Sequence, residues 1–423
     1  MILKKLLQIF QNKSMENKII QKNIPNGWEV EKLGNVAEVI MGQSPSSRSY
    51  NQNSIGLPFI QGKSDFSKNM KNIVIRQWTS EPTKISEIGD ILFTVRAPVG
   101  ELSINTEKIC IGRGISAIRV NKNFSRDYIY YSLLNIEDDI NKKAQGSTFT
   151  AINREDVKKI EFTIPLNKSE QEKIAEILSK VDEDIEKTKD IIEETEKLKN
   201  GLMQELLTKG IGHTKFKKTK SGEIPEAWEV CKLSEITDLI KDGTHGTHKN
   251  YQNGVPLLSA KDIINGEITL NNNPRLISES DFNLIHRGYQ IKEKDILLTV
   301  VGTIGRVSLI KDYTKKFTVQ RSVAILRFKK EFYPEFYYQY LSSSFFQKLL
   351  LEKARGAAQV GVYLASLGEI FVNKLPIKEQ KEIAEILSSV DEKISVNKKL
   401  KEKLTQLKKG LMSDLLSGKI RVI

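Results

Sequence analysis

The chain has 423 residues, of which 39% are hydrophobic, and its 66 Lys and Arg against 53 Asp and Glu give a formal net charge of +13. This length and composition are those of a globular protein with two or three domains. No stretch approaches about 18 consecutive apolar residues, which argues against a membrane-spanning helix, and the two cysteines, Cys110 and Cys231, cannot form a disulfide framework.

The chain begins with MILKKLLQIF, in which Lys4 and Lys5 break the apolar run and no small-residue cleavage site follows. A secretory signal is therefore not expected. We expect residues 1–23 to form an N-terminal extension with an amphipathic turn, and we predict a cytoplasmic location.

A first globular domain is predicted over residues 24–168. It opens with Ile24-Pro25 and a short strand around Trp28, and it continues through β-type segments such as residues 91–95, which Gly, Asn and Pro separate. Residues 128–135 have a helical pattern. This mixture predicts an α+β domain.

Residues 169–208 contain no Pro and carry apolar residues at alternating steps of four and three, which predicts one long helix with a coiled-coil seam. At 1.5 Å per residue, roughly 40 residues span about 60 Å, which favours a spacer over a helix that covers a small core.

The rest of the chain repeats this plan. Trp28-Glu29-Val30 returns as Trp228-Glu229-Val230 at an offset of 200, and the helix that starts at Glu170 returns at Glu379 (379 − 170 = 209). We predict a linker at residues 209–223, a second domain at 224–377 with a helical stretch at 334–351, a second spacer helix at 378–417 and a tail at 418–423.

The two long helices are predicted to pair with each other, because each seam alone is only marginally apolar. The alternative is two independent amphipathic helices, each on its own domain. The seam residues are Ile174, Leu178, Val181, Ile185, Ile192, Leu202 and Leu206 in the first helix, and Ile383, Leu387, Val390, Ile394, Leu404, Leu411 and Leu415 in the second.

Connectivity sets the direction of this pairing. The second helix starts after a domain that is tethered to the far end of the first helix, so it must run back antiparallel and bring the C-terminal KIRVI beside the first domain. The predicted fold class is α+β: two α/β domains separated by two long antiparallel coiled-coil helices in a pseudo-two-fold tandem duplication.

Catalytic motifs are not found. The segment 56–64, GLPFIQGKS, resembles a phosphate-binding loop but has five residues between its glycines where that loop has four. His245 and His248 have a spacing that would suit zinc, but no third ligand lies nearby, so hydrogen bonding in a loop is favoured. The acidic pairs Asp138-Asp139 and Asp182-Asp184 are interpreted as solvated helix faces. We predict no catalytic residue, metal or cofactor in this chain.

The positive charge suggests a polyanionic partner, and its distribution is informative. Of 14 arginines, none lies in the two long helices and 13 lie between Ile24 and Pro376. Because Arg makes bidentate contacts with guanine and phosphate, the globular domains are the expected nucleic-acid surface.

The duplicated I-P-x-x-W-E-V-x-K-L opening, KDGTH at 241–245, DILLTVVGTIG at 295–305, A-x-G before each helix and the EQ-x-x-IA-x-IL helix start resemble the specificity subunits of type I restriction-modification systems. One departure is Ala97-Pro98-Val99, where the second copy has Gly-Thr-Ile.

This resemblance implies two target recognition domains, each reading one half of a split double-stranded DNA sequence. It also implies helices that space the half-sites and dock two methyltransferase subunits. Those subunits carry S-adenosylmethionine, and restriction subunits join the larger complex.

The duplication sorts the candidate DNA contacts. Residues common to both copies are expected to serve phosphate binding or the scaffold, whereas residues found in one copy are candidate base readers. The shared set is Lys63, Arg113, Arg119, Lys261, Arg321 and Arg327, with Gly146 and Gly356. The candidate readers are Arg48, Arg76, Arg96, Thr244, His245, Arg275, Arg287 and Arg306.

Two other classes stay open at this point. A self-contained enzyme would need the catalytic motifs that we do not find. A coiled-coil adaptor for other proteins would need no DNA at all.

Overall fold

The structure is a computed structural model that describes residues 24–66, 73–136, 151–220, 222–270, 274–354 and 361–422. It divides into two compact units: unit 1 is Met1–Lys187 with Leu400–Ile423, and unit 2 is Thr188–Lys399. Predictions for residues 1–23, for Asp138-Asp139 and for Gly146 and Gly356 lie outside the described residues.

Unit 1 contains a four-stranded antiparallel sheet between two apolar cores. Its strands, in spatial order, are β2 (Ala37–Met41), β10 (Ile115–Val120), β7 (Ile91–Thr94) and β8 (Leu102–Ile104). Every residue of β7 is buried, and because side chains alternate along a strand, Ile91 and Phe93 enter one core and Leu92 the other.

The two faces of this sheet are covered by different elements. On one face, the core includes Tyr128 of α3 (Arg126–Asn135) and apolar residues of both long helices. On the other face, it includes residues of a five-stranded sheet in the order β3 (Tyr50–Asn51), β5 (Trp78–Thr79), β4 (Leu57–Ile60), β9 (Ile109–Ile111) and β6 (Ile85–Ser86). A separate strand pair joins β1 (Trp28–Lys32) to β11 (Glu161–Pro165), and α2 (Leu33–Val36) and α5 (Arg154–Lys158) complete the unit.

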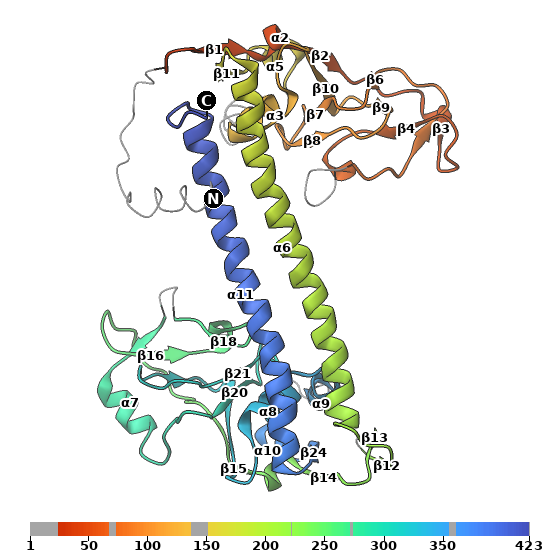
Figure 1. Ribbon diagram of the computed structural model, residues 1–423. Coiled ribbons are helices and arrows are strands. Elements are labelled where there is room, and N and C mark those ends of the chain that lie inside the picture. The colour runs from red at the N-terminus through yellow and green to blue at the C-terminus, as the bar shows by residue number, and fades with distance from the viewer. Residues whose placement is uncertain are drawn as a thin grey trace. The chain divides into compact units, whose positions relative to one another are not determined.

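Unit 2 repeats the four-stranded sheet and the separate strand pair of unit 1, whereas its second sheet differs (Figure 1). Its four-stranded sheet has the order β15 (Thr237–Asp242), β23 (Val323–Phe328), β20 (Ile296–Thr299) and β21 (Val307–Leu309), and β14 (Glu229–Lys232) pairs with β24 (Phe371–Lys374). A three-stranded sheet joins β19 (Leu276–Ile277), β16 (Val255–Leu258) and β22 (Thr318–Val319), and β17 (Ile263–Ile264) pairs with β18 (Glu267–Ile268). Its short helices are α7 (Glu279–Ile285), α8 (Pro334–Ser342), α9 (Ser344–Ala354) and α10 (Leu364–Gly368).

Two sequence predictions need correction here. The helical stretch predicted over residues 334–351 is two helices, because the extended backbone of Ser343 interrupts it and its Oγ accepts a hydrogen bond from the Phe346 N–H at 3.2 Å. The predicted linker contains a hairpin of β12 (Phe216–Thr219) and β13 (Gly222–Pro225), which the Lys-rich composition did not indicate.

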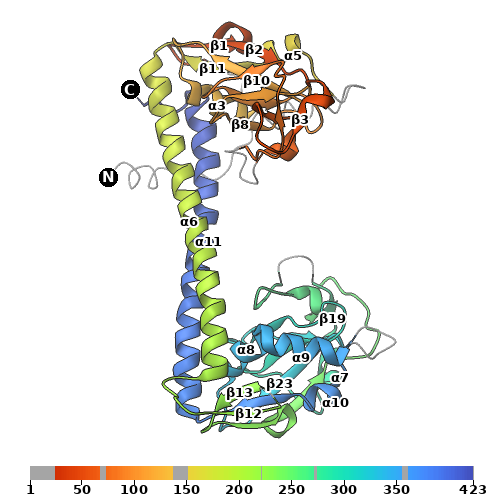
Figure 2. The same ribbon diagram turned by 90° about the vertical axis from the view of Figure 1, so that its right-hand side faces the viewer.

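The long helices are α6 (Lys168–Lys209) and α11 (Ile377–Leu415), with bounds one or two residues from those predicted. The N-terminal part of α6 and the C-terminal part of α11 lie side by side in unit 1 (Figures 1 and 2). In unit 2, Lys199 of α6 pairs with Asp391 of α11 at 2.6 Å, and Glu196 pairs with Lys398 at 2.7 Å, so the helices run antiparallel. The alternative of two independent helices is therefore wrong.

Most of the predicted seam residues are buried. Leu202, Leu206, Ile185 and Leu404 are only half-buried, whereas Met203 and Leu207, outside the predicted seam, are buried in the core of unit 2. The heptad pattern missed these two residues because they face the domain and not only the partner helix.

The EQ motif at each helix start connects the helix to its domain. The Gln171 side chain accepts a hydrogen bond from the Ser125 N–H at 2.8 Å and donates to the Pro165 carbonyl at 2.9 Å. Gln380 does the same with the Tyr333 N–H and the Leu375 carbonyl. Both glutamines are 1% exposed, so the repeated motif has a structural role.

The neighbouring glutamates hold the residues that follow the end of the other long helix. In unit 1, Glu170 pairs with Arg421 at 2.6 Å, which places the C-terminal tail on the first domain as predicted. In unit 2, Glu379 accepts hydrogen bonds from the Trp228 Nε1–H and the Ile211 N–H and lies 2.9 Å from His213 Nε2.

A buried ion pair links α6 to α11 in unit 1. Asp182 lies 2.7 Å from Lys408 Nζ and accepts a hydrogen bond from the Tyr131 hydroxyl of α3 at 2.9 Å. Asp182 is 6% exposed, so its predicted place on a solvated face was wrong. Unit 2 repeats the arrangement, with Lys199, Asp391 and the Gln339 amide, which donates to Asp391 at 2.7 Å.

We expect Lys408→Ala to destabilise the protein by about 2 to 4 kcal/mol, because it leaves the Asp182 carboxylate buried without its cation. Adding Asp182→Asn to this variant should recover part of the loss, since an amide oxygen still accepts from Tyr131. Urea denaturation measures both effects. Lys409→Ala, at an exposed neighbouring position, is the matched control, and an equal loss in that variant would contradict the prediction.

A second buried titratable group lies in unit 2. His286, at the end of α7, is 9% exposed, its Nδ1–H donates to the Tyr289 carbonyl at 3.2 Å, and its Nε2 has no partner among the described residues. Burial among Phe282 and Tyr289 lowers the pKa of His286 below its ordinary value of 6.5.

The unfolded chain therefore binds a proton at His286 more readily than the folded chain does. Above pH 6.5 the imidazole is neutral in both states, and the folded protein has its full free energy of unfolding. As the pH falls from 6.5 through the lower pKa that His286 has in the folded protein, part of this stability is lost. Denaturation midpoints measured from about pH 8 to about pH 5 should fall more steeply for the wild type than for His286→Leu. Parallel curves for the two proteins would show that His286 does not contribute.

Candidate nucleic-acid interface

In each unit, a tight backbone junction positions a loop cluster at one end of the four-stranded sheet. Gly42, just after β2, donates its N–H to the Ile115 carbonyl at 2.9 Å, and Gly243, just after β15, donates to the Val323 carbonyl at 3.2 Å. A Cβ on either glycine would collide with backbone atoms of the facing loop. Glycine is therefore required where this loop approaches so closely.

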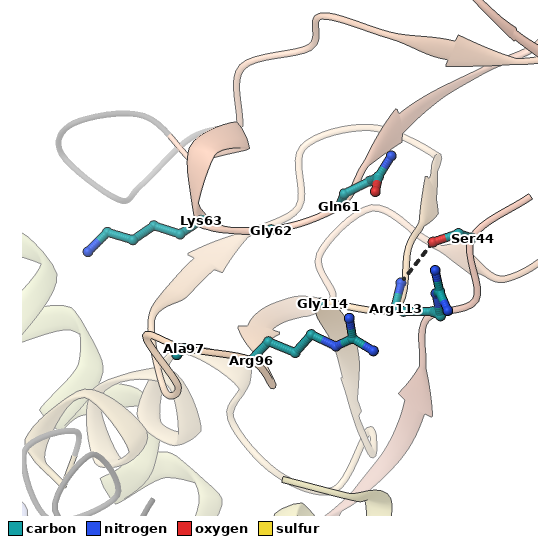
Figure 3. Close-up of a pocket in the computed structure, with 8 residues that line it drawn as sticks. All are labelled: Ser44, Gln61, Gly62, Lys63, Arg96, Ala97, Arg113 and Gly114. Carbon is teal, nitrogen blue, oxygen red and sulfur yellow. Dashed lines mark hydrogen bonds between the residues drawn. The ribbon is translucent and has the colours of Figure 1, made fainter. Parts of the chain in front are cut away.

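In unit 1 these loops surround a pocket of about 140 Å³ (Figure 3). Its lining residues are Ser44, Gln61, Gly62, Lys63, Arg96, Ala97, Arg113 and Gly114. The backbone N–H of Arg113 donates to the Ser44 hydroxyl at 3.4 Å, which connects two of the loops. The pocket thus brings together three residues that the sequence singled out: Lys63, Arg96 and Arg113.

These three cations differ in how they are held. Lys63 is paired with the buried Glu101, and Figure 3 shows its side chain extending away from the two arginines. Arg96 and Arg113 are exposed, and within the described parts of the chain neither has a carboxylate within ion-pair distance. Two guanidinium groups in one pocket without a carboxylate favour an anionic or acceptor-rich ligand.

Unit 2 has the same backbone frame with different side chains. Thr244, after Gly243, accepts the Arg321 N–H through its carbonyl at 3.1 Å, and Arg321 and Lys261 are both exposed. Val301 takes the place of Arg96, since both follow the buried central strand and both form an isolated bridge, Arg96 with Ala151 and Val301 with Gly361.

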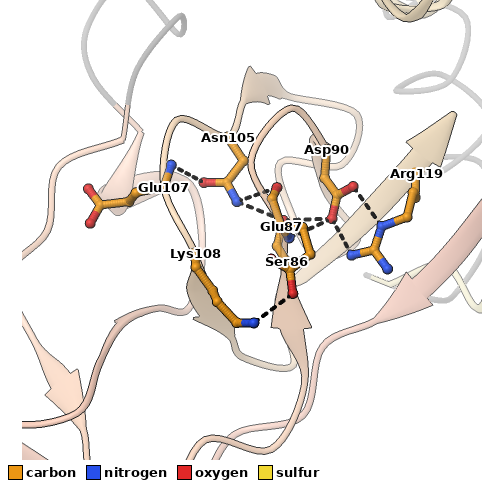
Figure 4. A network of polar contacts seen from close by, with 7 residues as sticks. All are labelled: Ser86, Glu87, Asp90, Asn105, Glu107, Lys108 and Arg119. Carbon is orange, nitrogen blue, oxygen red and sulfur yellow. Dashed lines mark hydrogen bonds and ion pairs between the residues drawn. The ribbon is translucent and has the colours of Figure 1, made fainter.

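The shared arginines Arg119 and Arg327 form ion pairs with buried carboxylates. Arg119 pairs with the buried Asp90 at 2.8 Å, and Figure 4 shows this carboxylate also accepting from Ser86 and the Glu87 N–H. Arg327 pairs with Asp295 at 2.7 Å. These hydrogen bonds raise the pKa of both arginines and favour the scaffold alternative over phosphate contact.

Besides Arg96, four of the candidate base readers make hydrogen bonds or ion pairs with residues of their own unit. Arg306 donates to the carbonyls of Ala260 and Ile263 at 3.1 and 2.9 Å, Arg275 donates to the His248 carbonyl, and Arg76 lies 3.3 Å from Asp65. His245 lies 2.6 Å from Asp242.

Thr244 has a hydrogen bond of 2.9 Å to His248 Nε2, so the two loop histidines make hydrogen bonds, as the sequence favoured. Arg48 and Arg287 are exposed and do not line the unit 1 pocket. Among the candidate readers, only Arg96 lines the pocket that the shared cations Lys63 and Arg113 also line.

Sequence reasoning missed Ser44, Gln61 and Glu101. Ser44 and Gln61 line the pocket, and Glu101 pairs with Lys63. A residue-by-residue comparison of the two copies contained a signal, because Glu101 of the first copy stands where the second has Arg306 (GDILFTVRAPVGE against KDILLTVVGTIGR).

Among the described residues, no group of three or more His, Cys, Asp or Glu is arranged to hold a metal ion. In the same part of the chain, no helix is long and apolar enough to cross a membrane.

Comparison with known proteins identifies a family. Residues 25–197 and 225–406 match the family described as "Type I restriction modification DNA specificity domain". The chain is similar to the type I restriction enzyme MjaVIII specificity subunit of Methanocaldococcus jannaschii, with 28% identity over 417 residues, covering 94% of each chain. It is also 39% identical over 203 residues to a putative MjaX specificity subunit of the same organism, covering 47% of each chain.

Solved structures agree on the fold. The crystal structure of a type I restriction-modification S subunit from M. genitalium superposes with a TM-score of 0.62 and 18% sequence identity. The match covers 95% of this chain and 98% of that chain. At this identity the likeness concerns the fold alone.

We expect Arg113→Ala and Arg119→Ala to have separable effects. Loss of the exposed Arg113 should weaken binding to every DNA duplex and reduce the salt dependence by about one phosphate contact, with little change in melting temperature. Loss of Arg119 should lower the melting temperature, because Asp90, which is 3% exposed, would then lack its cation.

Fluorescence anisotropy over a salt series and thermal unfolding of the same proteins distinguish these outcomes. A change in sequence preference with Arg113→Ala would assign that residue to base reading instead.

Proposed function

The chain belongs to the family of type I restriction-modification DNA specificity subunits, and on this basis we propose that each of its two units reads one half of a split DNA target. As a specificity subunit, the chain is the DNA-recognition component and not the catalytic one.

One observation carries the two-half-site proposal. Both units hold the same loop junction, with Gly42 or Gly243 at its centre and an exposed arginine, Arg113 or Arg321, beside it. Residues around that junction differ between the units. A common frame supports contacts common to any duplex, and the differing side chains support different base preferences.

We propose that double-stranded DNA and the other subunits of a type I complex are the partners. Two methyltransferase subunits would bind S-adenosylmethionine and modify the DNA, and restriction subunits would complete the assembly. The two cysteines, Cys110 and Cys231, are free and buried, which fits a reducing cytoplasm.

The long helices offer a surface for the methyltransferase subunits. Ile191 of α6 is 47% exposed, and Leu400, its counterpart in α11 (400 − 191 = 209), is 44% exposed. Leu198 and Val396 are also exposed, at 57% and 58%. Exposed apolar side chains on both long helices, with Ile191 and Leu400 at matching positions, fit one docking surface per copy and hence two equivalent partner subunits.

The helices are also proposed to set the number of unread base pairs between the half-sites, because the offset between the two copies stays at 209 along the helices while it varies in the loops of the domains. The rival adaptor function accounts for the exposed apolar residues but not for the duplicated arginine loops.

Exchange of one domain tests this function. Replacement of residues 24–167 by the matching segment of a related subunit with a different target should change one half of the recognised sequence. The other half of the recognised sequence and the number of base pairs between the two halves should stay the same, because the domain of unit 2 and both long helices are retained. Methylation of DNA by the reconstituted complex, mapped by sequencing, is the measurement. A change in both halves would contradict independent reading, and a changed gap would contradict the spacer role.

A further inference from the structure

We propose that Arg96 is the residue of unit 1 that reads a guanine in its half-site, and that Arg306, the arginine of the corresponding turn in unit 2, is a positioning residue that does not read a base. This inference rests on the proposed function, since it names the chemical group that one domain recognises.

The two arginines belong to one structural element that occurs twice. In unit 1, the Val95 N–H donates to the Gly114 carbonyl at 3.0 Å and the Gly100 N–H donates to the Thr94 carbonyl at 2.9 Å. In unit 2, Val300 donates to Ser322 and Gly305 donates to Thr299, each at 2.9 Å. The turn between the central strand and the next strand therefore has the same backbone bonds in both units.

The arginine occupies a different position of this turn in each copy. The first copy has Arg96 at the start of the turn and Glu101 at its end, and the second copy has Val301 at the start and Arg306 at the end. The hydrogen bonds that flank the turn are the same, although the turn of unit 1 contains a cis Ala97–Pro98 peptide bond and that of unit 2 has Gly302 at positive φ. The start and the end of the turn can therefore be compared between the units.

At the end of the turn, the side chain faces the neighbouring 3₁₀ turn. Glu101 pairs there with Lys63 of η2 (Lys63–Asp65). Arg306 donates there to the carbonyl of Ala260 of η4 (Ala260–Asp262) and to that of Ile263. Since carbonyls accept both Arg306 Nη1–H groups, this guanidinium holds a loop in place.

At the start of the turn, Arg96 is presented to a ligand. Its side chain is exposed and lines the pocket with Arg113, and Figure 3 shows its guanidinium extending toward that residue. Gln61 and Ser44 add an amide and a hydroxyl to the same pocket. Gly114 also lines the pocket, and unit 2 has Ser322 in its place, whose hydroxyl accepts the Ala260 N–H at 3.2 Å.

The ligand chemistry follows from these groups. The planar guanidinium donates two parallel hydrogen bonds, and the major-groove edge of guanine presents O6 and N7 as two adjacent acceptors. Arg113, which both copies share, is suited to a contact with a DNA phosphate, and such a contact fixes the register of the protein on the duplex. Arg96, which only the first copy has, suits the base edge beside that phosphate.

The test compares wild type, Arg96→Ala, Arg96→Lys and Arg306→Ala as full-length chains in complex with the methyltransferase subunits. Each complex selects duplexes from a random library, and affinities are then measured on the duplex that the wild type prefers. Arg96→Ala should lower affinity for that duplex by about 5- to 150-fold and relax one G·C position in one half-site. Its melting temperature should match that of the wild type.

Arg96→Lys separates base from phosphate contact. Lysine keeps the charge but not the two-pronged geometry, so the relaxed position should persist in this variant. Restored affinity and preference in Arg96→Lys, or a uniform loss on all duplexes in Arg96→Ala, would assign Arg96 to a phosphate and overturn the proposal.

Arg306→Ala is the matched control. It should lower the melting temperature and weaken binding without relaxing a single position, and a relaxed position there would overturn its role as a positioning residue. A wild-type complex without any sequence preference would contradict the proposed function itself. A wild type with a clear preference that Arg96→Ala leaves unchanged would contradict only the assignment of Arg96.

Discussion

The pairing of α6 with α11 is the interaction on which each unit depends. The core of unit 1 contains Ile174 and Leu178 from the first copy together with Leu411 and Leu415 from the second. Neither copy of the duplicated sequence therefore completes a unit from its own residues. The first domain needs the end of the second helix, and the second domain needs the end of the first.

Polar groups inside this pairing make it specific. An apolar seam alone tolerates shifts along the helix, whereas the buried Asp182 is paired in the register that brings Lys408 to it. The Tyr131 hydroxyl extends the same network into the first domain. Because Lys199, Asp391 and Gln339 repeat the arrangement, the duplicated chain applies one solution in both units.

A rigid frame with variable side chains is suited to sequence recognition. The ion pairs of Arg119 with Asp90 and of Arg327 with Asp295 occupy matching positions in the two sheets and hold the strands that precede the loops. Variation is then confined to the loop side chains, where Arg96 faces a pocket and Val301 does not offer a donor. A change of recognised base at such a position need not alter the core.

The sequence by itself determined the duplication, the two long helices and the α+β domains, because these depend on periodicity and on order along the chain. It also identified the arginines as the residues to examine. It did not separate Arg113 from Arg119, or Arg96 from Arg306, and it placed Asp182 on a solvated face. Those distinctions depend on which distant group lies opposite each side chain, namely Asp90, Ala260 and Lys408. Only the tertiary structure decided them, since the burial and the partner of a charged group are set by contacts between segments far apart in the chain.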